Sequence, residues 1–246
     1  MARLDQAVSR ILRVKIRAGL FEAGLPSKRK YAGRFDLLAA PEHKEIARTA
    51  VRQSLVLLKN AKQLLPLSPS ANILVTGDGA DNIGKQTGGW TLSWQGTGNT
   101  KEHFPQAMSI YEGIEEQVAA AGGQVTLSLE GEYKNTPDVA IVVFGEDPYA
   151  EFQGDRPHLD FQSEAGLALL NKFKAQGIPT VAVFLSGRPM WMNPEINAAD
   201  AFVAAWLPGS EGGGIADVLL RSGKDEIQQD FRGKLSFSWP RTAVQT

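Results

Sequence analysis

The sequence predicts an α/β fold: a doubly wound, mostly parallel sheet of about six strands, sandwiched by helices. The first observation behind this is that short strand-like runs alternate with helix-like runs along most of the chain. The second is that inner strand-like runs such as 181–185, Val-Ala-Val-Phe-Leu, are apolar on both faces. Strands of that kind are covered by helices on both sides, as happens in parallel sheets.

The first elements along the chain are helical. Apolar residues at positions 4, 8, 11, 12 and 16 form one stripe, which predicts an amphipathic helix over 2–21. The polar and basic segment that follows, 26–41, is expected to be a linker. A second helix is expected from Pro41 to Leu58. Glu42 and Glu45 lie in its first turn, where carboxylates interact favourably with the helix dipole.

The remaining elements follow the alternation. We expect strands over six runs, which are 73–76, 124–129, 139–144, 180–185, 201–206 and 234–239. We expect helices over 106–121, 163–176 and 211–221. In the last strand-like run, three apolar residues alternate with polar ones, which predicts an edge strand with one solvated face. Edge strands of such sheets are often antiparallel, so this last strand is expected to be antiparallel.

The composition excludes several classes of function. Apolar residues make up 43% and charged residues 22% of the chain, as in ordinary globular proteins. The net charge of −1 gives no electrostatic basis for binding nucleic acid or an anionic membrane, so neither is expected as a partner. Cysteine is absent, which excludes disulfides and thiolate chemistry. The three histidines lie far apart without metal-ligand spacing, so we expect no metal and no cofactor.

A loop rich in carboxylates follows the predicted strand 139–144. This segment, 145–155, reads Gly-Glu-Asp-Pro-Tyr-Ala-Glu-Phe-Gln-Gly-Asp. In an open α/β sheet, loops at the carboxyl ends of the strands line the ligand crevice. A carboxyl group flanked by aromatic rings there is placed for general acid/base chemistry, and the rings are expected to raise its pKa. Glu151 and Glu146 are the candidates, and a solvated acidic loop without function is the alternative.

Two tryptophans occupy a glycine-rich segment, 88–96, which reads Gly-Gly-Trp-Thr-Leu-Ser-Trp-Gln-Gly. The flanking glycines suit neither a strand nor a helix, so the segment is predicted to be a loop. A tryptophan on a loop offers a flat apolar face to a sugar ring, and the alternative is that the rings pack in the core. We expect Trp94 to bind substrate and Trp90, its neighbour, to have more of a packing role.

Two further segments follow predicted strands. Arg188 comes after the strand 180–185 and is either an ion-pair partner of the acidic loop or a surface charge. The segment 77–79, Gly-Asp-Gly, follows the strand 73–76 like the start of a dinucleotide-binding motif. Asn82 stands where the third glycine of that motif would be, so the signal is weak.

Five stretches, taken in order, resemble glycoside hydrolase family 3, the group of β-glucosidases and exo-β-glucan glucohydrolases. They are 10–21, 54–67, 88–96, 145–155 and 206–214. The resemblance implies that residues 1–25 are the last helix of a (β/α)8 barrel that this chain lacks. It further implies that 26–41 is a linker and that 42–246 is an (α/β)6 sandwich domain. The implied enzyme is a retaining, exo-acting glycosidase for β-linked glucosides or glucan oligosaccharides.

The resemblance also implies roles for individual residues. Glu151 matches the acid/base glutamate of the family, and Trp94 matches a tryptophan that stacks on a glucosyl unit, with Trp90 beside it. The family's nucleophile is an aspartate of the barrel in a Ser-Asp-Trp-like motif, and no Asp-Trp pair occurs here. A retaining glycosidase needs two carboxyl groups roughly 5–5.5 Å apart. The isolated chain is therefore expected to be inactive, with the barrel domain as its partner.

A different class of function stays open at this point. The same fold serves non-catalytic modules that bind a sugar or nucleotide at the sheet edge, and a scaffold domain could use the tryptophan loop as a protein contact. A free-standing module has no need for an amphipathic helix and a basic linker before its first strand. The beginning of the sequence therefore favours the glycosidase.

Overall fold

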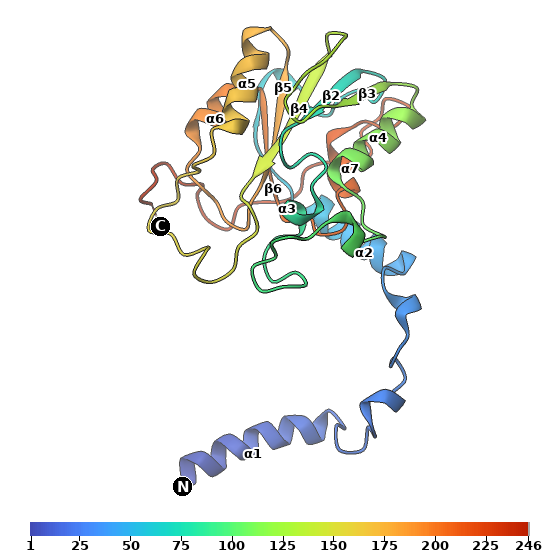
Figure 1. Cartoon of the computed structure of the whole chain (residues 1–246), viewed down its shortest axis with the longest axis vertical. Coiled ribbons are helices and arrows are strands. Elements are labelled where there is room, and N and C mark those ends of the chain that lie inside the picture. Colours follow the sequence, from blue (N-terminus) through green and yellow to red (C-terminus); the bar gives the residue numbers. More distant parts are fainter. Residues whose placement is uncertain (246) are drawn as a thin grey trace. The chain divides into compact units, whose positions relative to one another are not determined.

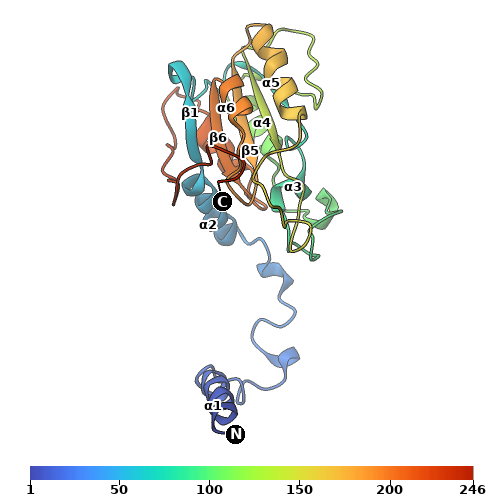
Figure 2. The same cartoon turned by 90° about the vertical axis from the view of Figure 1, so that its left-hand side faces the viewer.

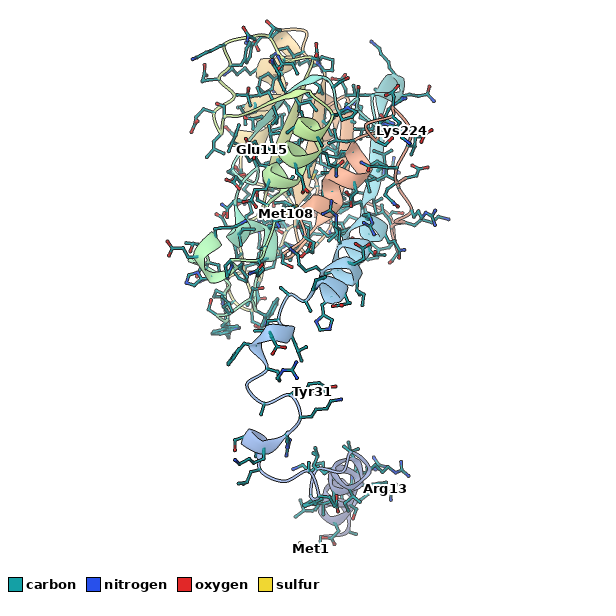
Figure 3. The ribbon with its side chains drawn as sticks, turned by 90° about the vertical axis from the view of Figure 1, so that its right-hand side faces the viewer. Met1, Arg13, Tyr31, Met108, Glu115 and Lys224 are labelled. Atoms are coloured by element: carbon teal, nitrogen blue, oxygen red, sulfur yellow. The ribbon has the colours of Figure 1, made fainter. Side chains whose placement is uncertain are left out.

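The computed structural model describes residues 1–245, and the chain divides into two compact units, Met1–Pro41 and Glu42–Thr246. The first unit contains α1 (Ala2–Arg17) and two short 3-10 helices, Pro26–Lys28 and Phe35–Leu37. No residue of α1 is buried, and Figure 3 shows side chains such as Arg13 projecting from it. The predicted first helix is confirmed. It ends before the predicted boundary because Gly19, at φ +65, turns the chain.

The second unit is an α/β sandwich. Its strands are β1 (Val56–Asn60), β2 (Asn72–Thr76), β3 (Gln124–Leu127), β4 (Val139–Gly145), β5 (Thr180–Leu185) and β6 (Ala201–Trp206). Its α-helices are α2 (Pro41–Ser54), α3 (Ile83–Thr87), α4 (Ile110–Ala120), α5 (Ala165–Ala175), α6 (Asn193–Ala198) and α7 (Gly213–Leu219). Of these, the short helices α3 and α6 were not predicted.

The strands form one sheet in the order β1-β6-β5-β4-β2-β3. From β6 to β3 all neighbours are parallel, and β1 pairs antiparallel with β6 at one edge, as Figure 2 shows. Phe202, Ala182 and Val142 lie side by side across the adjacent strands β6, β5 and β4. The predicted fold class, a doubly wound and mostly parallel six-stranded sheet with an antiparallel edge strand, is confirmed.

The prediction that residues 234–239 form the antiparallel edge strand was wrong. That strand is β1, within a run expected to continue the second helix, whereas 234–239 forms no strand. Helix α2 ends at Ser54, and the chain then pairs with β6, so β1 occupies this edge. Trp239 packs its ring against Trp206, with centroids 6.2 Å apart, while Phe237 is exposed. The last run therefore covers the sheet with side chains and does not extend its ladder.

The core has two layers because both faces of the sheet are apolar. On one face Ile141 and Val143 pack with residues of α2, α4 and α7. On the other face Val142 and Phe144 pack with residues of α5 and α6. Figure 1 shows the two groups of helices on opposite sides of the sheet, and Glu115 on the outer side of α4 points to solvent in Figure 3. This arrangement is what the apolar strands predicted.

Because β2, β4, β5 and β6 are parallel, their carboxyl ends meet at one edge of the sheet. The loops that follow them are the turn 77–82, the long loop 146–164 and the loops 186–192 and 207–212. Such an edge is where open α/β sheets bind ligands. Among residues 1–245, no helix is both long and apolar enough to cross a membrane.

Candidate functional site

The acidic loop 146–164 begins at the carboxyl end of β4 and is anchored there by Lys85 of α3. The Lys85 ammonium donates to the carbonyl of Gly145 at 3.0 Å. It also pairs with Asp147 at 2.8 Å and with Asp78 of the β2 turn at 2.9 Å. Its side chain is only 4% exposed, so the two carboxylates compensate a buried charge. Sequence reasoning missed Lys85, since a single lysine on a short helix has no distinguishing pattern.

Glu146 and Arg188 form the second anchor of this loop. The Arg188 guanidinium contacts the Glu146 carboxylate at 2.6 Å, and the Ser186 hydroxyl donates to the other carboxylate oxygen at 2.7 Å. Arg188 also donates to the carbonyl of Gly154 at 2.6 Å and lies over the ring of Tyr149, 4.3 Å from its centroid. Of the two readings of Arg188, the ion pair with the acidic loop is confirmed. Glu146 holds the loop through side chains, and both of its oxygens are engaged.

Glu151 lies farther along the same loop and is exposed. One of its carboxylate oxygens accepts a hydrogen bond from the Trp94 indole N–H at 2.6 Å. This bond lowers the pKa of Glu151, with a smaller contribution from Trp90. The prediction that aromatic neighbours raise this pKa was therefore wrong for the described chain. Phe152 is itself 76% exposed, so the rings do not enclose the carboxylate, and hydrogen bonding outweighs desolvation.

The tryptophan loop lies beside the acidic loop. Trp94 is 53% exposed and meets Phe152 edge-on, with ring centroids 5.7 Å apart. The amide N–H of Trp90 donates to the carbonyl of Trp94 at 2.9 Å, which closes the loop. Trp90 is 62% exposed, so the prediction that it mainly packs was wrong. At φ +56 its backbone is in the left-handed region, and its side chain lines a surface hollow instead of the core.

Gln95 joins the two loops through backbone atoms. Its side-chain oxygen accepts from the amide of Ala150 at 2.7 Å, and its side-chain nitrogen donates to the carbonyl of Glu151 at 2.9 Å. The loops also approach closely at Gly89, where a Cβ atom would lie 1.8 Å from the carbonyl oxygen of Tyr149. Gln95 is a second residue that sequence reasoning missed. Its partners are backbone groups far along the chain, and such bonds leave no spacing signal.

Two hollows of about 310 Å³ each flank the start of the acidic loop. One is lined by Arg156, Phe161 and Arg188 together with the first residues of the loop. The other is lined by Trp90, Leu207 and the same loop. Both combine aromatic surface with hydrogen-bonding groups, which is how sites for polar small molecules are built. Within residues 1–245, no cluster of His, Cys, Asp or Glu has the geometry to hold a metal ion.

Within residues 145–155, Glu151 and Asp155 are exposed and form no salt bridge to residues 1–245, and Glu151 is the one that accepts a hydrogen bond from a tryptophan indole. The Glu146 carboxylate is bound by Arg188, and the Asp147 carboxylate is bound by Lys85. Glu151 faces solvent beside an exposed indole, so a substrate can reach both. A single carboxyl group can donate or accept a proton, but retaining glycoside hydrolysis requires a second carboxylate as nucleophile.

Comparisons with known proteins identify the family. Residues 55–246 match the family model described as the glycosyl hydrolase family 3 C-terminal domain. The chain belongs to glycoside hydrolase family 3. The resemblance noted in the sequence is thereby confirmed, and this family 3 chain is similar in sequence to two curated glucosidases.

One of these relatives is the lysosomal beta glucosidase of Dictyostelium discoideum, which is 31% identical over 98% of this chain and 31% of that protein. The other is the periplasmic beta-glucosidase of Salmonella typhimurium, which is 31% identical over 100% of this chain and 35% of that protein. The family 3 chain therefore spans about a third of the length of these curated relatives.

Solved structures of the family give the same result. The exo-1,3/1,4-beta-glucanase (ExoP) of a Pseudoalteromonas species is 56% identical with a TM-score of 0.94, over 99% of this chain and 31% of that chain. The beta-glucosidase of Listeria innocua in complex with glucose is 28% identical with a TM-score of 0.73, over 97% of this chain and 32% of that chain. The sandwich described above is thus the fold of family 3 enzymes.

The hydrogen bond from Trp94 leads to a prediction for the family 3 chain as it stands. We expect Trp94→Phe to raise the pKa of Glu151 toward that of an ordinary glutamate, because phenylalanine keeps a ring but donates no hydrogen bond. Carboxyl-detected NMR titration of residues 1–246 measures this pKa. The matched control is Trp90→Phe, which should produce a smaller rise. An unchanged pKa in Trp94→Phe would show that the indole does not stabilise the carboxylate.

Proposed function

We propose that this chain supplies the general acid/base and the aglycone-side sugar contact of a retaining, exo-acting β-glucosidase or β-glucan glucohydrolase. The observation that carries the proposal is the exposed Glu151 carboxylate held by the Trp94 indole at the carboxyl edge of the sheet. The relatives named beta-glucosidase and exo-1,3/1,4-beta-glucanase support β-linked glucosides or glucan oligosaccharides as substrates. The Listeria innocua beta-glucosidase has been solved with glucose and, as a mutant, with laminaribiose.

In the proposed mechanism, Glu151 transfers protons in both half-reactions. A carboxylate of a second domain attacks the anomeric carbon, and protonated Glu151 gives its proton to the departing glycosidic oxygen as that bond breaks. Ionised Glu151 then takes a proton from water as the water oxygen attacks the anomeric carbon and releases the enzyme carboxylate. The face of Trp94 stacks on the leaving sugar, with Trp90 beside it.

The acid step needs a protonated Glu151, whereas the hydrogen bond from Trp94 favours the ionised form. Covering the site with a barrel domain and a sugar would bury the carboxyl group, and burial raises the pKa of an acid. The same covering would protect the glycosyl-enzyme from side reactions. We propose that the missing partner is this barrel, which also supplies the nucleophile.

The domain assignment belongs to the same proposal. The apolar stripe of α1, including Leu4, Val8 and Ile11, is exposed in the described chain. A stripe of this kind suits a helix that packs against neighbouring helices and strands. We therefore assign residues 1–25 to the last helix of the barrel, 26–41 to a linker and 42–246 to the sandwich domain.

The experiment that tests the proposed function compares residues 1–246 with a longer protein that carries the barrel as well. We expect the longer protein to hydrolyse p-nitrophenyl β-glucoside and laminari-oligosaccharides, and the isolated chain to show no turnover, because no nucleophile can form the glycosyl-enzyme. The proposal fails if the longer protein leaves β-glucosides intact. It also fails in its two-domain form if the isolated chain turns them over and Glu151→Ala abolishes that activity.

A further inference from the structure

The tryptophan loop and the acidic loop meet at the side chain of Gln95. Gln95 is half-buried, and both polar atoms of its amide are used. The oxygen accepts from the amide of Ala150 at 2.7 Å, and the nitrogen donates to the carbonyl of Glu151 at 2.9 Å. Two bonds from one planar amide to adjacent residues fix the direction of the backbone as well as its position.

The backbone that Gln95 holds is a tight turn. The amide of Gly154 donates to the carbonyl of Ala150 at 2.8 Å, and the amide of Gln153 donates to the carbonyl of Glu151 at 3.0 Å. Phe152 lies between them at φ +71, in the left-handed region. Because the turn is closed by its own bonds, it can move as a unit. The position of Glu151 therefore depends on the hydrogen bonds between this turn and the rest of the chain.

Arg188 and Gln95 hold this turn from two sides. Arg188 bonds the carbonyl of Gly154 at the end of the turn, at 2.6 Å. Gln95 bonds the residues at its beginning and follows Trp94 directly in the sequence. The residue that bonds the Glu151 backbone is thus attached to the residue that bonds its carboxylate. A shift of the tryptophan loop therefore acts on both the backbone and the carboxylate of Glu151, through hydrogen bonds from two adjacent residues.

We propose that Gln95 is a positioning residue that locks the Glu151 turn to the tryptophan loop, so that the proton donor and the sugar-stacking ring keep one fixed separation. The inference rests on the proposed role of Glu151. It goes beyond that role because Gln95 would set the distance between the Glu151 carboxyl group and the Trp94 ring. Misplacement of a catalytic group by about 1 Å can cost on the order of 100-fold in rate.

The substitution that tests this is Gln95→Met, which keeps the length of the side chain and removes both hydrogen bonds. The control is Gln153→Met on the same turn, since the Gln153 side chain is exposed and makes no hydrogen bond within residues 1–245. In residues 1–246 we expect hydrogen exchange at the Ala150 amide to become faster in Gln95→Met and to stay unchanged in Gln153→Met. Unchanged exchange in Gln95→Met would overturn the proposed anchor.

In the barrel-containing protein, kcat/KM is measured for two substrates. Gln95→Met is expected to lower it on the order of 10- to 100-fold for phenyl β-glucoside and much less for 2,4-dinitrophenyl β-glucoside, because a good leaving group needs less help from the acid. A purely structural residue would lower both equally, and that result overturns the proposal. Gln229→Met, at an exposed position that lines neither hollow, should leave both values unchanged.

A double-mutant cycle separates the two proposals. In a Glu151→Ala background, Gln95→Met should cause almost no further loss, because a residue that acts through Glu151 has nothing left to position. Additive losses would overturn the positioning role while leaving the acid/base role intact. If Glu151→Ala alone shows no dependence on the leaving group, the proposed function fails and the positioning role with it, whereas the exchange measurement still reports whether Gln95 anchors the turn.

Discussion

Glu151→Ala in the barrel-containing protein is expected to slow hydrolysis of β-glucosides with poor leaving groups by about 10²–10⁴-fold. The loss should shrink for activated aryl glucosides, because their leaving groups depart without a proton. With such substrates the glycosyl-enzyme should accumulate, since the second step also needs Glu151 as a base. Azide attacks that intermediate without a base, so it should restore turnover and give a β-glucosyl azide. Steady-state kinetics with and without azide measure both effects.

The matched control is Glu146→Gln, which alters the glutamate at the start of the loop while keeping its size. Glu146 is bound by Arg188 and Ser186, so we expect it to affect stability without any azide-dependent recovery. If Glu146→Gln showed the dependence on leaving group and the azide rescue, and Glu151→Ala did not, the acid/base would be Glu146. The identity of the proton donor is thus decided by a pattern of rates, which a fold defect cannot imitate.

Arg188→Met is expected to lower the free energy of unfolding of residues 1–246 by about 3–5 kcal/mol. The Glu146 side chain is only 9% exposed, so removal of its cation leaves a largely buried carboxylate with the neutral Ser186 hydroxyl as its remaining partner. The variant also loses the bond to the Gly154 carbonyl and the contact with the ring of Tyr149. Urea denaturation followed by circular dichroism gives the free energy directly.

Two further variants test the cause of that loss. Arg188→Met combined with Glu146→Gln should recover part of the stability, because a neutral amide costs less to bury than an unpaired carboxylate. Arg241→Met, which removes an exposed arginine, should change the free energy by less than about 0.5 kcal/mol. If Arg188→Met changed the free energy of unfolding as little as Arg241→Met does, the ion pair would contribute little to stability.

The central strands of the fold were predictable because short runs of apolar residues indicate strands that are buried on both faces. In β4 and β5 every residue is buried, and both runs are largely apolar. The two edge errors have the opposite origin. Leu55 and Leu58 continue a helical spacing, yet β1 forms because β6 offers an open edge. Residues 234–239 alternate like a strand, but β1 already pairs with β6 at that edge of the sheet. Which segment pairs with the free edge of β6 depends on residues far apart in the sequence, so local sequence patterns cannot predict it.

The candidate site was predictable to a similar degree. The sequence and its family resemblance indicated Glu151 and Trp94, and the structure brings them within hydrogen-bond distance. The direction of the pKa shift was wrong because it depends on exposure, and flanking aromatic residues do not reveal whether rings enclose a carboxylate. Gln95 and Lys85 were missed because each bonds groups that only the folded chain brings close.

Three side chains hold the first part of the acidic loop. They come from helix α3, from the tryptophan loop and from the loop that follows β5. Lys85, Arg188 and Gln95 bind within residues 145–154, whereas Pro157 and His158 lie exposed beyond them. Arg156 and Phe161, which line one of the two hollows, also belong to this later part. The backbone of Phe161 is nevertheless tied to Trp191 of the β5 loop, and its ring packs against Phe144 and Phe184. The exposed residues around Pro157 lie between these two anchored parts, so insertions or deletions there disturb neither. The loop is thus anchored near both of its ends, and we expect natural variation in its length to fall around Pro157, away from Glu151 and from Phe161.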